Sequence, residues 1–105
     1  MWHDDFTVQS AREGEDLVVR PIGDLDIATV ARVEQAAASA GRDSSRLVLD
    51  LGEVGFADTS GLRLFVALDR RARAEGFELT LRRCSGALRR IMDIAGLSPR
   101  IACED

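Results

Sequence analysis

Residues 46–62 read RLVLDLGEVGFADTSGL, and this stretch contains a candidate strand followed by the beginning of a candidate helix. The apolar run at 47–49 has no polar break, which is typical of a strand that is covered on both faces. Asp58 or Thr59 then supplies a favoured helix N-cap, and Ser60 falls in the first helical turn, near free backbone N–H groups. The stretch therefore predicts a buried strand, a loop and a helix in succession.

The rest of the chain continues this alternation in both directions. Asp26 is the expected N-cap of an earlier helix, Ser85 is the expected N-cap of a later one, and a glycine follows each helix as its C′ residue. The expected elements in chain order are strands at 6–9 and 16–22, a loop at 23–26, a helix at 27–40, a strand at 46–51, a loop at 52–57, a helix at 60–75, a strand at 77–82, a helix at 86–95 and a short strand at 101–103.

Strands that alternate with helices imply an α/β fold with a mostly parallel sheet of four to five strands and helices packed on it. The 105 residues fall inside the usual single-domain range of about 50–200 residues, and no linker or repeat interrupts them. The sequence thus predicts one domain over residues 1–105, with its core at about 6–102.

Charge and composition exclude several kinds of partner. The chain has 14 arginines, no lysine and 18 acidic residues, so its net charge is −4 and its arginines are interleaved with acids. It lacks the basic face of a nucleic-acid binder, and its apolar runs are far shorter than the roughly 20 residues that span a bilayer. The segment Met1 to Asp5 shows no secretory signal, so we expect a cytoplasmic protein that neither binds nucleic acid nor inserts into a membrane.

Neither a metal site nor an active site is predicted. Cys84 and Cys103 have no metal-type spacing, and we expect them to be small core residues rather than a disulfide. The only histidine, His3, lies at a terminus, the loop before Ser60 is not a nucleophile elbow, and without lysine no Walker-type phosphate loop can form. Three acids, namely Asp26, Asp50 and Asp58, could gather near Ser60 around a divalent ion, but caps and strand-end hydrogen bonds explain them more simply. We therefore predict a protein without a cofactor that is not an enzyme.

Three segments together resemble a known family. They are the sequence GDLD at 23–26 before a helix, the strand at 47–51 with FADTSGL at 56–62, and IMDIAGL at 91–97. In this order, and with this alternation of strands and helices, they resemble the STAS domain, and in particular the bacterial anti-sigma factor antagonists. The segment DTSGL at 58–62 is the most specific of the three.

The resemblance implies a function and a switch. In that family the unphosphorylated antagonist binds an anti-sigma factor, often a serine kinase, and so releases a sigma factor. The kinase phosphorylates the serine that matches Ser60, and a serine phosphatase restores it. The same match implies a binding surface formed by Asp24, Asp26, Asp58, Thr59, Ser60 and Gly61. The alternative is a STAS subunit of a lipid-transport or other membrane-associated complex, which shares the fold and has no phosphoserine switch.

Overall fold

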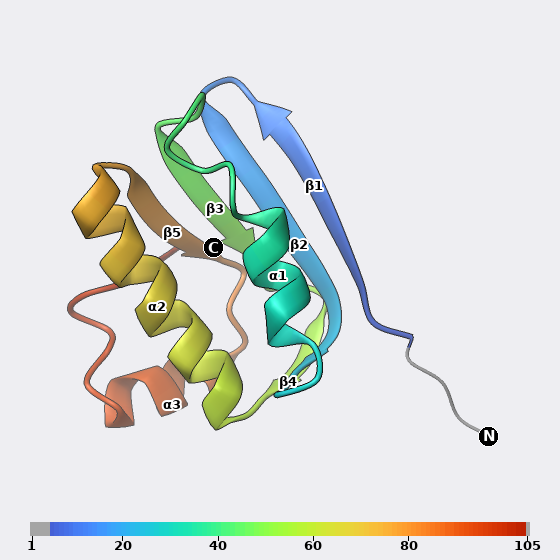
Figure 1. Cartoon of the computed structure of the whole chain (residues 1–105). Coiled ribbons are helices and arrows are strands. Elements are labelled where there is room, and N and C mark those ends of the chain that lie inside the picture. The colour runs from blue at the N-terminus through green and yellow to red at the C-terminus, as the bar shows by residue number, and fades with distance from the viewer. Residues whose placement is uncertain (1–4, 105) are drawn as a thin grey trace.

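The computed structural model describes residues 5–104 and consists of one sheet with three helices (Figure 1). The sheet order is β1-β2-β3-β5-β6, and β4 pairs with the end of β2. Only the β1–β2 pair is antiparallel, so the prediction of a mostly parallel α/β sheet is confirmed. The elements are β1 (Thr7–Glu13), β2 (Asp16–Leu25), α1 (Val30–Ala36), β3 (Arg46–Asp50), β4 (Val54–Ala57), α2 (Thr59–Glu75), β5 (Glu78–Arg82), α3 (Gly86–Ile94) and β6 (Ala102–Glu104).

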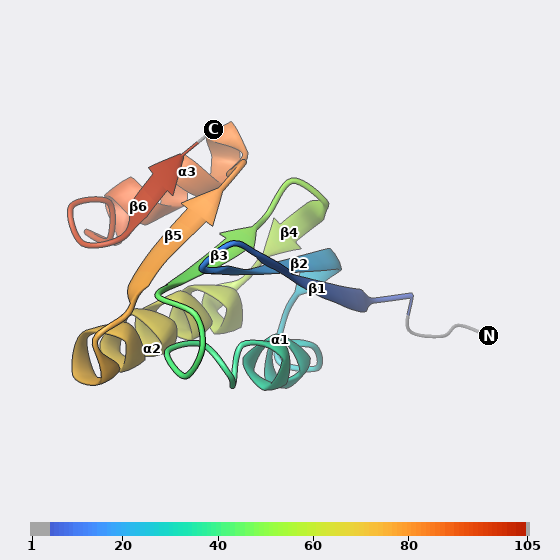
Figure 2. The ribbon, with the colours of Figure 1, turned by 90° about the horizontal axis from the view of Figure 1, so that it is seen from above.

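The three helices occupy two different places around the sheet. Helices α1 and α2 cover the same face, whereas α3 lies near the carboxyl end of β5 (Figures 1 and 2). The hydrophobic core is centred on Phe65 of α2, Val33 of α1 and the β3 residues Leu47 and Leu49, all fully buried. Val48, which points to the other face of β3, is also buried, so this strand is covered on both faces as its sequence predicts.

Two predicted loops are in fact strands. Residues 54–57 form β4, and the segment 23–25 continues β2, which pairs with it in parallel. The sheet therefore has six strands rather than four to five. A four-residue strand with a glycine in it is too short to leave a clear period in the sequence, and the backbone pairing with β2 is what defines it.

The first helix is shorter than predicted, and Asp26 is not its N-cap. The backbone carbonyl of Asp26 accepts hydrogen bonds from the N–H groups of Thr29 and Val30, at 3.0 and 3.1 Å, which forms a turn before the helix. The N-cap position belongs to Thr29. Just after the other end, the Arg71 guanidinium of α2 donates to the carbonyls of Ala37, Ala38 and Ala40 and so ties this segment to α2.

The ends of the other two helices follow the sequence predictions. The Asp58 carboxylate accepts a hydrogen bond from the N–H of Ser60 at the start of α2, and the Ser85 hydroxyl accepts from the N–H of Leu88 in α3. Gly76 ends α2 with a φ of 81°, a left-handed conformation that favours glycine. Helix α2 is thus fixed at both ends by local chemistry.

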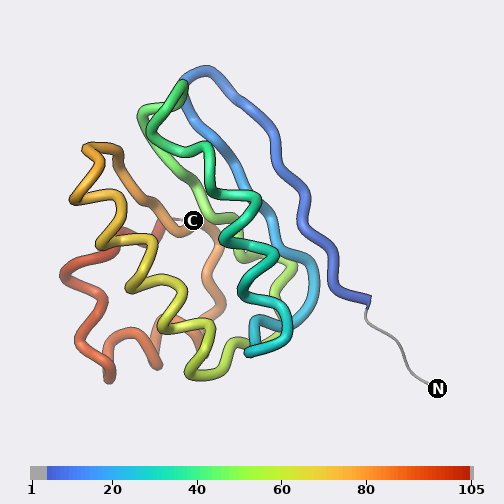
Figure 3. The backbone as a smooth tube through the Cα atoms, viewed as in Figure 1, coloured from blue at the N-terminus to red at the C-terminus, as the bar shows by residue number. Residues whose placement is uncertain are grey.

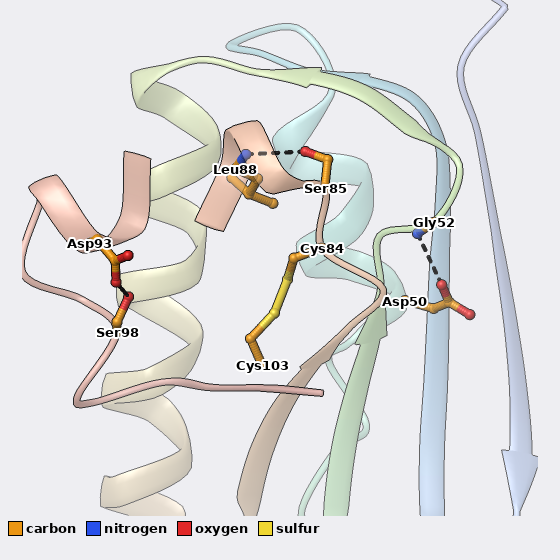
Figure 4. The surroundings of a disulfide bond; sticks show 8 residues. All are labelled: Asp50, Gly52, Cys84, Ser85, Leu88, Asp93, Ser98 and Cys103. Carbon is orange, nitrogen blue, oxygen red and sulfur yellow. Dashed lines mark hydrogen bonds between the residues drawn. A yellow bond between two sulfur atoms is a disulfide. The ribbon is translucent and has the colours of Figure 1, made fainter. Parts of the chain in front are cut away.

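The two cysteines form a disulfide, contrary to the prediction (Figure 4). Strand β6 pairs in parallel with β5, and Cys103 lies opposite Leu81. The chain leaving β5 therefore brings Cys84 within 6.8 Å of Cys103, measured between Cα atoms, although the two cysteines are 19 positions apart in sequence. Sequence spacing carries no information on this strand pairing, which is why the prediction was wrong.

Candidate functional site

Ser60 lies in the first turn of α2, and hydrogen bonds of Asp58, two residues earlier, fix the backbone there. Asp58 is extended, its Oδ1 accepts from the N–H of Ser60 at 2.7 Å, and its own N–H donates to the carbonyl of Leu25 at 3.1 Å. Ser60 itself is half-buried, and within residues 5–104 its hydroxyl has no hydrogen-bond partner. The helix start is therefore anchored to β2, while the hydroxyl stays available.

Gly61 allows the start of α2 to approach the sheet closely. A Cβ atom at this position would lie 3.0 Å from the Cβ of Ala57 and 3.2 Å from the Cβ of Leu25. Both contacts are tighter than ordinary van der Waals packing, and both atoms belong to short, rigidly placed strand ends. Any larger residue at 61 would push the first helical turn, and Ser60 with it, away from β2 and β4.

The pairing of β2 with β4 brings the two predicted site segments to one end of the molecule. Leu25 is opposite Ala57 in this pair, so the segment 24–26 runs beside the chain that leads into Ser60 (Figure 3). Both segments lie at the carboxyl ends of parallel strands, where open α/β sheets place their functional loops. The structure thus brings Asp24 and Asp26 to the same end of the sheet as residues 58–61.

Hydrogen bonds hold the segment before α1 in shape. The Thr29 hydroxyl donates to the carbonyl of Asp24 at 2.8 Å and accepts from the N–H of Asp26 at 3.0 Å. The Asp26 carboxylate accepts from the N–H of Ala28 at 2.9 Å. The Asp24 side chain is exposed, whereas Asp26 is half-buried. Sequence reasoning missed Thr29, although threonine hydroxyls, like aspartate carboxylates, often bond to nearby backbone groups in turns.

Apolar side chains surround this end of the sheet, and sequence reasoning also missed them. Ile27, the first residue of the helix predicted at 27–40, is 80% exposed and precedes α1, and Phe56 is 59% exposed. A hollow of about 210 Å³ lies between α1 and α2. Large exposed apolar residues beside a polar site are typical of a protein-binding surface. The hollow is lined by Ile27, Val30, Glu34, Ser60, Arg63, Leu64 and Ala67.

Asp50 does not join the other two acids near Ser60. It is 1% exposed and accepts a hydrogen bond from the N–H of Gly52 at 3.0 Å (Figure 4). It also accepts hydrogen bonds from Arg83 at 2.5 Å and from Arg20 at 3.1 Å. Burial alone would raise the pKa of Asp50, but these hydrogen bonds outweigh it and lower that pKa to about 2. Among the residues that the structure describes, no group of three or more potential ligands is placed to hold a metal ion.

Two further expectations from the sequence concern the histidine and membrane insertion. His3 lies outside the described residues. In the described part of the chain, no helix is long and apolar enough to cross a membrane.

Comparison with known proteins places the fold and the family. A family model described as "Mlab, STAS domain" matches residues 8–100. No curated protein matches the chain in sequence. An anti-sigma factor antagonist from Mycobacterium paratuberculosis is 25% identical, with a TM-score of 0.79 over 95% of this chain and 86% of that chain.

Three other solved structures, which represent two proteins, share the fold. The anti-sigma factor antagonist SpoIIAA is 22% identical; its unphosphorylated form gives a TM-score of 0.74 over 93% of this chain and 86% of that chain. The phosphorylated form, from Bacillus, gives 0.71 over 93% and 89%. A sulfate transporter family protein from Wolinella succinogenes is 13% identical, with a TM-score of 0.78 over 90% of this chain and 80% of that chain. The match over residues 8–100, together with this shared architecture, shows that the chain belongs to the STAS domain family.

Proposed function

We propose that this protein is an anti-sigma factor antagonist whose unphosphorylated form binds an anti-sigma factor with serine kinase activity and so releases a sigma factor. The observation that carries the proposal is the Ser60 hydroxyl, which has no partner within residues 5–104 and lies at an anchored helix start. Exposed Ile27 and Phe56 at the same end of the sheet supply apolar area for a protein partner. The neighbours named as antagonists support the same function.

The proposed switch is phosphorylation of Ser60. The Ser60 oxygen attacks the γ-phosphorus of ATP in the kinase, ADP leaves, and the hydroxyl proton passes to a base of the kinase. A serine phosphatase returns the hydroxyl by hydrolysis with water. Each cycle adds and removes about −1.5 to −2 charges and three acceptor oxygens at one point of the binding surface.

Local electrostatics suggest that the phosphate changes binding more than folding. The dipole of α2 stabilises an anion in its first turn by about 0.3–1 kcal/mol, whereas the nearby carboxylates of Asp58 and Asp26 oppose it. The two effects oppose each other at the start of α2, so we expect the fold to change little. A phosphate that is desolvated against a partner surface costs several kcal/mol, and about 5.5 kcal/mol converts a 99:1 equilibrium to 1:99.

In this proposal the other predicted residues form the surface around the serine. Asp24, Asp26 and Thr59 supply polar contacts to the partner, since Asp24 and Thr59 are exposed and Asp26 is half-buried. Asp58 and Gly61 hold the helix start in position, through the N–H of Ser60 and through close packing on β2 and β4. We propose no catalytic residue and no cofactor.

The experiment is capture of partners from an extract of the source cells. Immobilised wild-type protein and Ser60→Asp protein are compared, and the bound proteins are identified by mass spectrometry. We expect a sigma-regulating serine kinase on the wild type and much less of it on the variant. Incubation of the purified pair with ATP should then place a phosphate on Ser60; a phosphate on Thr59 or Ser85 alone would contradict the assignment.

A second candidate function has one observation in its favour. The fold also matches a sulfate transporter family protein, so a STAS subunit of a membrane-associated transport complex is the alternative. The same capture experiment separates the two. A transporter ATPase bound equally well by wild type and by Ser60→Asp would favour the alternative and exclude the switch.

A further inference from the structure

Arg63 is one of the arginines that have no partner within residues 5–104. Most arginines of the chain bond to a carboxylate or to backbone carbonyls, as Arg20, Arg46 and Arg71 do. Four arginines within residues 5–104 have no hydrogen bond, ion pair or ring contact: Arg42, Arg63, Arg70 and Arg90. Because the chain has 18 acidic residues, a guanidinium that none of them engages calls for an explanation.

Arg63 is also the unpaired arginine that lies next to Ser60. It follows Ser60 by three positions in α2, and residues three apart on a helix have Cβ atoms about 5–6 Å apart. Long helical side chains lean toward the helix N-terminus, so Arg63 covers the turn that holds Ser60. Both residues line the hollow between α1 and α2. The residue four positions after Ser60 is Leu64, which is buried and apolar, so Arg63 is the polar neighbour of Ser60 in the next turn.

We infer that Arg63 binds the phosphate of phosphorylated Ser60 within the same chain. The inference rests on the proposed phosphorylation and adds a residue to the switch. A guanidinium presents paired N–H donors that match phosphate oxygens, and these charge-assisted bonds are stronger than neutral ones. In the unmodified protein Arg63 is a free exposed cation on the binding surface. Phosphorylation both adds an anion and occupies this cation, so the surface loses a positive contact as well as gaining a negative group.

Several acids compete for Arg63 or repel the phosphate. Glu34 of α1 lines the same hollow, and Asp58 and Asp26 lie at the same end of the sheet. None of the three forms an ion pair with Arg63 in the described structure. A phosphate with about two negative charges, one turn away on the same helix, attracts Arg63 more strongly than a single carboxylate on a neighbouring helix does.

The test measures the second pKa of a phosphoserine installed at position 60 during translation, so that no kinase is needed. Titration followed by phosphorus NMR compares four proteins: the wild type, Arg63→Gln, Arg63→Lys and Arg70→Gln. A neighbouring cation lowers this pKa from its ordinary value of about 6, so Arg63→Gln should raise it by about 0.2–0.7 units. Arg63→Lys should give an intermediate value, because lysine keeps the charge but lacks the paired donors.

Arg70→Gln is the matched control, since Arg70 is an equally unpaired arginine two turns further along α2. It should leave the pKa unchanged, and the difference between wild type and Arg63→Gln should shrink as salt is raised. Equal values for wild type and Arg63→Gln, or equal shifts for both Gln variants, would overturn the inference. Such a result would not contradict the proposed function. Conversely, failure to capture a kinase partner would contradict the proposed function but would not change what the titration shows about Arg63.

Discussion

Two polar clusters of this protein have opposite designs. Around Asp50, a buried carboxylate bonds two arginines and a backbone N–H, and these bonds connect β2, β3 and the end of β5. Around Ser60, the backbone is anchored equally well, but the hydroxyl and the guanidinium of Arg63 have no partner in the described chain. The charged groups of the first cluster all have bonding partners within the protein. The hydroxyl and the guanidinium of the second cluster remain available to a binding partner.

The contrast indicates that the Asp50 cluster serves stability and the Ser60 cluster serves binding, although both lie on the same sheet. A carboxylate buried with fully satisfied hydrogen bonds stabilises only the native arrangement, and loss of a partner leaves a costly buried group. A hydroxyl and an exposed guanidinium that bond to nothing else in the protein add little to folding. Substitutions at the first cluster should therefore change stability, and substitutions at the second should change binding.

Asp50→Ala tests the contrast with the largest expected effect. The change removes the acceptor of Arg20, Arg83 and the N–H of Gly52, and it should lower the free energy of unfolding by about 2–3 kcal/mol. This is below the 3–5 kcal/mol typical of a fully buried pair, because both guanidiniums are partly exposed. Urea denaturation measures it. The control is Asp43→Ala, which breaks an exposed pair with Arg12 and should cost less than about 1 kcal/mol.

The pH dependence of stability sharpens the same point. The pKa of Asp50 is about 2 in the folded protein and 3.8 ordinarily, so the carboxylate binds its proton less readily when folded. Its contribution of about 2 kcal/mol is therefore present above pH 3.8 and is lost as the pH falls toward 2. Unfolding measured between pH 5 and pH 2 should show this loss, and Asp50→Asn should have a shallower slope. Identical slopes would mean that other carboxylates dominate the acid transition.

Gly61→Ala tests the anchoring of the site itself. The new methyl group would meet Ala57 and Leu25 at 3.0 and 3.2 Å, and overpacking of this kind costs about 1–2 kcal/mol. The displaced helix start should also weaken partner binding. The control is Gly86→Ala at the start of α3, where nothing lies within 4 Å of the added atom, so stability should stay the same or rise slightly. If both variants melt alike, the close approach at Gly61 is unimportant.

Local signals were sufficient to predict some elements and not others. The buried strand at 47–49, the Asp58 cap and the Gly76 end follow from neighbouring residues alone, because their chemistry is local. Strand β4, the disulfide and the exposure of Ile27 depend on which strands pair and on where a turn ends. Arg63 belongs to no sequence motif, and only the structure shows that it has no partner and that it lines the same hollow as Ser60.

Charge at Ser60 should have the smallest effect on folding and a clear effect on binding. Ser60→Asp and Ser60→Glu should weaken association with the anti-sigma partner at least tenfold, about 1.4 kcal/mol, whereas Ser60→Ala should bind normally and resist phosphorylation. An acidic side chain carries one charge and lacks the tetrahedral shape of a phosphate, so the phosphorylated protein should bind more weakly still. Calorimetric affinities are measured beside a melting curve for each variant.

Melting should barely differ among the Ser60 variants, because the first turn of α2 tolerates an anion. The matched control is Ser10→Asp on β1, an exposed serine away from the carboxyl ends of the parallel strands, which should change neither affinity nor melting. Acidic Ser60 variants that unfold would show that the serine belongs to the stabilising class of cluster, like Asp50. Acidic variants that bind as tightly as the wild type would show that charge at this position does not control the interface.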